Sequence, residues 1–159
     1  MQRLIVGTGT VGVPGVREYA YTLEETSSGW LTAALPAIAT RGGQVVVVGG
    51  GLSAVEAAFK LALQHPALRV QLVAPRQLGH ELPHARADRL HAALARQRIA
   101  VREDITVLAV QTNRLVTDAG LIVFSACVWA LLPEHVSLSL AVPRFLRAHR
   151  TDTNSKCAC

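Results

Sequence analysis

Short apolar runs, separated by glycine-rich or amphipathic segments, set the pattern of this chain. The plainest run is the four valines over 45–48, which is typical of a strand buried on both faces. The alanine-rich segment 54–64 follows it and predicts a helix, because alanine has the highest helix propensity. His65 and Pro66 end that helix.

The same alternation continues toward the middle of the chain. Apolar runs over 68–73 and 99–102 predict two more strands, and segment 84–98 predicts a helix with Leu90 and Leu94 on one face. Strand–helix–strand units of this kind form parallel sheets with right-handed crossovers. The sequence therefore predicts an α/β fold with a Rossmann-like parallel sheet.

A different hydrophobic pattern follows this unit. Three short apolar runs, over 105–110, 115–117 and 121–124, are separated by turn residues at Asn113 and 118–120. That spacing is typical of an antiparallel β-meander. We therefore expect a three-stranded meander appended to the parallel sheet.

The flanks are less regular. Segment 126–132 predicts a last strand and segment 3–7 a first one, whereas 18–29 is polar and indicates a loop. Segment 30–40 contains good helix formers, but we expect Pro36 to break its helix.

The valine strand leads into the pattern G-x-G-x-x-A at Gly49, Gly51 and Ala54, which matches a dinucleotide-binding fingerprint. The first glycine permits a tight turn, the second lets the backbone approach phosphates, and the alanine lets the helix pack on the strand. A glycine-rich turn without a ligand is the alternative. We expect the cofactor to contact Gly49, Gly50, Gly51, Leu52, Ser53 and Ala54.

Composition narrows the class of protein. The 159 residues, half of them hydrophobic, suit one compact core. The longest apolar run, 121–132, has 12 residues, well short of the ~20 of a membrane-spanning helix. The first residues lack the pattern of a signal peptide. We expect a cytoplasmic protein without a transmembrane segment, with peripheral membrane association left open.

The net charge of +5 does not indicate nucleic-acid binding. Arginine supplies 14 of the 16 basic residues, and these are scattered along the chain rather than clustered. Aromatic residues for base stacking are scarce, at 4%.

The histidines and cysteines of the sequence do not indicate a metal site or a redox-active thiol pair. His80 and His84 have the spacing of helical metal ligands, but a proline lies between them and no third ligand is near, so we expect no metal site. Cys127 lies in an apolar run and is expected in the core. Cys157 and Cys159 lie in a polar tail, and no C-x-x-C pair is present.

Four segments together resemble the NAD(P)H-binding domain of FAD-dependent pyridine nucleotide-disulfide oxidoreductases, and most of all type II NADH dehydrogenases. The four segments are 4–9, 13–20, 45–56 and 126–130. The first holds a hydrophobic strand and a small-residue turn, and the last has the sequence Ala-Cys-Val-Trp-Ala. The resemblance implies that 1–40 is the end of a flavin-domain segment and a crossover, and that 41–132 is the NAD(P)H-binding domain. Pro133 and Pro143 predict an irregular tail over 133–159, with a short helix near 144–147.

The resemblance also implies roles for residues. Gly49, Gly51 and Ala54 would hold the pyrophosphate, and Glu56 would lie where nicotinamide and flavin meet. An ordinary carboxylate on the helix surface is an equal alternative for Glu56.

Three departures from the family pattern stand out. Ala74 occupies the position of the acidic residue that binds the ribose 2′-hydroxyl. Arg76 could instead bind the 2′-phosphate of NADPH, and the alternative is that Arg76 is a solvated loop residue. The segment Leu131-Leu132-Pro133 stands where the family's closing strand reaches a glycine. The earlier flavin-binding fingerprint is missing, so the sequence looks like a fragment.

We therefore expect NAD(P)H as cofactor and an FAD-dependent NAD(P)H:acceptor oxidoreductase, with a quinone-type acceptor, as function. FAD would need a flavin-domain partner, and a homo-oligomer is also open. The alternative is a truncated, non-catalytic nucleotide-binding or interaction module.

Overall fold

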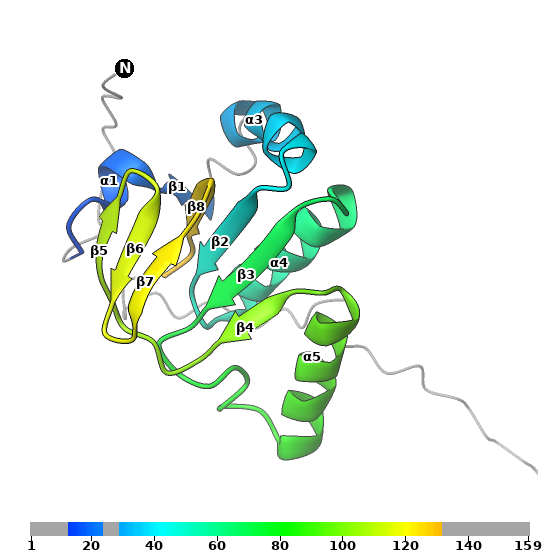
Figure 1. Ribbon diagram of the computed structural model, residues 1–159. Coiled ribbons are helices and arrows are strands. Elements are labelled where there is room, and N and C mark those ends of the chain that lie inside the picture. Colours follow the sequence, from blue (N-terminus) through cyan, green and yellow to red (C-terminus); the bar gives the residue numbers. More distant parts are fainter. Residues whose placement is uncertain (1–12, 24–28, 132–159) are drawn as a thin grey trace, which may run out of the picture.

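A computed structural model describes residues 13–23 and 29–131 (Figure 1). The predicted strand over 3–7, the helix near 144–147 and the tail 133–159 lie outside the described residues.

A five-stranded parallel sheet forms the centre of the molecule, with strand order β1-β8-β2-β3-β4. The strands are β1 (Tyr21–Thr22), β2 (Gln44–Val48), β3 (Arg69–Val73), β4 (Ala100–Arg102) and β8 (Ala126–Trp129). The predicted α/β fold is confirmed. The chain runs outward from β2 to β3 and β4, then returns to β8 on the other side of β2.

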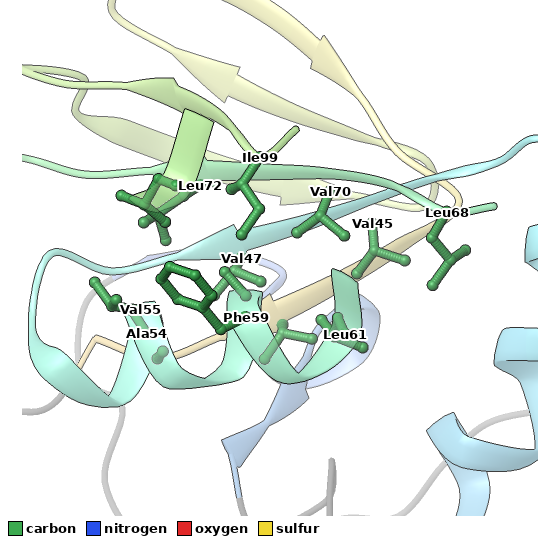
Figure 2. Close-up of a cluster of buried hydrophobic side chains, with 14 of the residues drawn as sticks. Val45, Val47, Ala54, Val55, Phe59, Leu61, Leu68, Val70, Leu72 and Ile99 are labelled. Atoms are coloured by element: carbon green, nitrogen blue, oxygen red, sulfur yellow. The ribbon is translucent and has the colours of Figure 1, made fainter. Parts of the chain in front are cut away.

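Three helices cover one face of this sheet: α3 (Gly29–Thr40), α4 (Leu52–Gln64) and α5 (His84–Arg96). Figure 2 shows how Val45 and Val47 of β2 face the side chains of α4, among them Val55 and Phe59. The exposed fraction of Val45 and Val47 is 0%, as expected for a central strand.

The other face carries helix α1 (Val16–Tyr19) and a separate antiparallel sheet (Figure 1). This second sheet is the predicted meander, made of β5 (Val107–Gln111), β6 (Arg114–Thr117) and β7 (Gly120–Val123). It packs on Val46 and Val48, the two valines of β2 that point away from the helices. Both faces of the valine run are therefore buried, because successive side chains alternate.

Two local predictions are wrong. Helix α3 continues through Pro36, which lies exposed on its surface, because buried Leu31 and Leu35 hold the helix on the sheet. The predicted loop over 18–29 begins instead with the end of α1 and with β1, whose Tyr21 is in register with Val128 of β8.

Candidate dinucleotide-binding site

The carboxyl ends of β2, β3 and β8 meet at one edge of the parallel sheet. The Gly49 amide donates to the Val73 carbonyl (2.8 Å), and the Ala130 amide donates to the Val48 carbonyl (2.8 Å). The order of the strands reverses at β2, and α/β sheets bind ligands in the crevice at such a switch point. The predicted fingerprint lies at this place.

Gly49 is required by the fold itself. Its φ of +156° lies in a region that side chains disfavour, and a Cβ there would come within 2.9 Å of the Ala54 Cβ and 3.0 Å of the Ala130 oxygen. Ala54 has an exposed fraction of 0%, so α4 approaches β2 as closely as the fingerprint predicts.

Gly51 has no such structural need. Its φ and ψ, −89° and 176°, suit any residue, and a Cβ added to it would meet nothing within 4 Å. The space beside Gly51 is open, as it must be where a ligand's phosphates are to approach the main chain.

The amino end of α4 presents unpaired amides to this space. The first intrahelical bond runs from the Val55 amide to the Gly51 carbonyl (3.2 Å), and Gly51 supplies no side-chain cap. The Leu52, Ser53 and Ala54 amides donate to no other described residue. The first turn of α4 carries no acidic side chain. No negative charge on α4 therefore offsets the positive end of the helix dipole, which favours an anion there.

The remaining predicted residues of this loop line the same corner. Gly50, Leu52 and Ser53 are half-buried. Glu56 is exposed on α4, two residues after Ala54.

Ala74 follows β3 directly and lies beside the turn, since a Cβ on Gly50 would be 3.6 Å from the Ala74 Cβ. It is fully buried and has no side-chain acceptor, so the usual ribose carboxylate is absent at this position. Arg76, two residues on, is exposed in the loop between β3 and α5, and its guanidinium makes no bond to another described residue.

Glu103 anchors the loop that carries Arg76. One of its carboxylate oxygens accepts from the Leu78 amide (2.6 Å) and contacts His91 Nε2 (2.8 Å). His91 Nδ1 lies 2.8 Å from the Ala87 carbonyl. That carbonyl, and then the Glu103 carboxylate, raise the pKa of His91 above its ordinary value.

The sequence analysis missed Glu103 and His91. The one available signal was position, because Glu103 is the first residue after β4 and polar residues at the carboxyl ends of parallel strands often serve a ligand site.

Leu131, the first residue of the Leu131-Leu132-Pro133 segment that stands where the family has its glycine, is half-buried and packs against the core between the two sheets. Leu132 and Pro133 lie outside the described residues. Cys127 has an exposed fraction of 0%, as predicted for a core residue, and burial raises the pKa of its thiol to about 12.

His80 and His84 do not form a shared site. His80 Nδ1 contacts the Gln77 carbonyl (3.1 Å), whereas His84 begins α5 and is exposed. Among the described residues no three His, Cys, Asp or Glu side chains are grouped to hold a metal ion. Nor does any helix of the described chain combine the length and apolarity needed to cross a bilayer.

Solved structures share this fold at low sequence identity. The Plasmodium falciparum NDH2 structure, solved with NADH, is 17% identical with a TM-score of 0.58, covering 78% of this chain and 32% of that one. The ferredoxin reductase of the Rhodopseudomonas palustris CYP199A2 system is 15% identical with a TM-score of 0.65, over 78% of this chain and 32% of that one. A pyridine nucleotide-disulfide family oxidoreductase of Enterococcus faecalis V583 is 17% identical with a TM-score of 0.63, over 84% and 32%.

This chain thus spans about a third of the length of these three structures. No curated protein matches the sequence. The sequence profile of a family described as pyridine nucleotide-disulphide oxidoreductase matches residues 1–151. The cofactors of this family are NAD(P)H and FAD. The chain therefore belongs to the pyridine nucleotide-disulphide oxidoreductase family.

Proposed function

We propose that residues 41–132 bind NAD(P)H in an FAD-dependent NAD(P)H:acceptor oxidoreductase and position its nicotinamide for the flavin. The observation that carries the proposal is the corner at Gly51. Open space at Gly51 and three free amides at the amino end of α4 provide what a pyrophosphate needs. The membership of the family supports the same assignment.

In this proposal the residues bind and orient the cofactor. The amides of Leu52, Ser53 and Ala54 donate to the pyrophosphate, and Gly51 leaves room for it. Glu56 faces the meeting point of the two cofactors. The chemistry that the two cofactors supply is hydride transfer from nicotinamide to flavin.

Replacing Gly51 with valine tests this directly. A Cβ at position 51 meets nothing within 4 Å, so we expect the fold to lose about 1 kcal/mol or less, the cost of a poor N-cap residue. The same side chain would occupy the pyrophosphate space, so NADH affinity measured by calorimetry should fall about hundredfold or more, roughly 2.7 kcal/mol.

Gly29→Val is the matched control, because Gly29 also has open space around it but lies in α3. It should leave NADH binding unchanged. Equal NADH affinity of wild type and Gly51→Val, or no NADH binding by the wild type at millimolar concentration, contradicts the proposal.

Arg76 leads us to propose NADPH as the preferred nucleotide. A cationic side chain near the end of β3, with alanine in place of the ribose carboxylate, favours a 2′-phosphate. We expect Arg76→Ala to lower the NADPH/NADH affinity ratio about tenfold, while Arg86→Ala in α5, also exposed, leaves the ratio unchanged. An unchanged ratio in Arg76→Ala means that Arg76 does not contact the 2′-phosphate.

A second candidate function is a non-catalytic nucleotide-binding or interaction module. It is favoured by the segment Leu131-Leu132-Pro133, which has no glycine where the family's closing strand reaches one. Absorbance separates the two candidates. A flavin spectrum of the purified protein, together with NADH oxidation in the presence of a quinone, supports the oxidoreductase, whereas a colourless protein that binds NADH supports the module.

A further inference from the structure

A groove of about 390 Å³ lies between β7 and the uncovered part of the parallel sheet. One side is formed by the last strand of the meander and the residues that follow it, including Leu121 and Val123. The other side is formed by Gln44, Arg69, Gln71 and Arg102. The groove does not include the fingerprint residues proposed to bind the nucleotide.

The backbone of β7 forms the outer edge of the meander on the side of this groove, and it has no strand partner there among the described residues. In the described part of the chain β7 pairs only with β6. Gln44 Nε2 donates to the Val123 carbonyl (3.0 Å), so the Val123 backbone is directed toward the groove, whereas the Phe124 amide bonds on the opposite side, to Asn113 (2.9 Å). Since backbone groups alternate along a strand, the Leu121 amide and carbonyl also face the groove.

The two edge strands of the meander differ in how they are covered. The edge of β5 is covered by α1, with the Val110 amide bonded to the Pro14 carbonyl (2.8 Å). Strand β7 contains no proline and no charge, which are the usual protections of an exposed edge, and its Leu121 and Val123 are 58% and 64% exposed. An apolar edge of this kind is a template for a further strand.

Charge selects the occupant. Two arginines line the groove, and no carboxylate does. The Nε of Arg69 donates to the Gly42 carbonyl (3.0 Å), and the Arg102 side chain bonds to no described residue, so positive charge is left facing the groove.

We propose that this groove binds an extended acidic segment of a partner protein, which adds to β7 as a fourth strand and directs carboxylates at Arg69 and Arg102. The chain's own segment 132–159 is a poor occupant, because it holds four basic and two acidic residues. A second copy is also disfavoured, because it would bring further arginines to the groove on a chain of net charge +5.

The proposal is tested with a fluorescein-labelled octapeptide of alternating valine and glutamate, titrated with the 159-residue chain by anisotropy. A valine–lysine octapeptide is the matched probe. We expect the glutamate peptide to bind and the lysine peptide not to bind. In the double variant R69E/R102E the affinity for the glutamate peptide should fall about tenfold or more. The double variant R86E/R89E, with the same change of charge on the exposed surface of α5, should bind like wild type.

Amide exchange locates the bound strand. The glutamate peptide should slow exchange of the Leu121 and Val123 amides, and L121P, which removes an outward amide, should abolish binding. If L121P does not fold, the exchange measurement on wild type decides alone. Equal binding of both peptides, no effect of R69E/R102E, unprotected Leu121, or a dimer that protects Leu121 without peptide each overturns the proposal.

Discussion

At the residue scale, Gly49 and Gly51 serve different purposes although they lie only two residues apart. Gly49 is held at a positive φ against Ala54 and Ala130, so the fold needs it whether or not a ligand binds. Gly51 has ordinary φ and ψ and an empty side-chain space, so the backbone does not require glycine there; it serves as the N-cap of α4 and leaves room for a ligand. Stability and binding can therefore be separated by single substitutions two residues apart.

Gly49→Ala should destabilise the protein by about 1–3 kcal/mol, because it combines backbone strain with a contact against the Ala130 carbonyl. Gly51→Ser should change stability by no more than a few tenths of a kcal/mol, since serine caps a helix about as well as glycine. Urea denaturation measures both. A Gly49→Ala protein as stable as Gly51→Ser would show that the turn relaxes and does not depend on glycine.

At the element scale, the loop after β3 is held by a long-range contact between α5 and the end of β4. The Glu103 carboxylate accepts from the Leu78 amide, and both ring nitrogens of His91 face oxygen acceptors. Only the doubly protonated imidazolium can donate to both acceptors at once. The protonated form of His91 thus fastens α5 to β4 and, through Glu103, supports the Arg76 loop.

This contact predicts a pH dependence. Because the folded pKa of His91 is raised, the folded state binds more protons than the unfolded state near neutral pH, so the stabilisation is complete below about pH 6.5, the unfolded value, and is lost as pH rises through the folded pKa. The free energy of unfolding of wild type relative to His91→Gln should be larger at pH 5.5 than at pH 8.5. A difference that is constant, or that grows with pH, contradicts this role.

Most elements follow from local pattern, and the exceptions share one cause. The valine run, the alanine-rich helix and the three apolar runs of the meander each carry their own periodicity, so sequence predicted β2, α4 and β5–β7. Strand β1 is only two residues long and is defined by pairing with β8, more than a hundred residues away, which no local pattern encodes. Helix α3 likewise persists past Pro36 through burial of its leucines.

The candidate site divides in the same way. The fingerprint from Gly49 to Ala54 is contiguous, so its position at the switch point could be predicted from sequence. The Glu103–His91–Leu78 contact joins three separate segments and became visible only when β4 and α5 were placed side by side.

At the scale of the whole molecule, one sheet separates two cores. The helices pack on one face and the meander on the other, so β2 and β8 contribute to both hydrophobic clusters. Cys127 lies in β8 between β1 and β2, with no exposed surface and a thiol pKa raised to about 12. Reaching its sulfur requires the layers to separate, which makes this thiol a reporter of global opening.

Labelling of Cys127 can therefore measure nucleotide binding through stability. In a C157S/C159S background, a thiol reagent should react with Cys127 only through the unfolded state, since the native thiol is buried and protonated. NADH at about 100 times its Kd should slow labelling about a hundredfold, because a ligand of the folded state stabilises it by about 2.7 kcal/mol. Without NADH, Gly51→Val should label within about fivefold of the wild-type rate, and NADH at the same concentration should slow its labelling no more than about twofold. Equal slowing in both proteins would place the nucleotide elsewhere than the corner at Gly51, whereas rapid labelling of the native wild type would show that the sheet opens locally at β8.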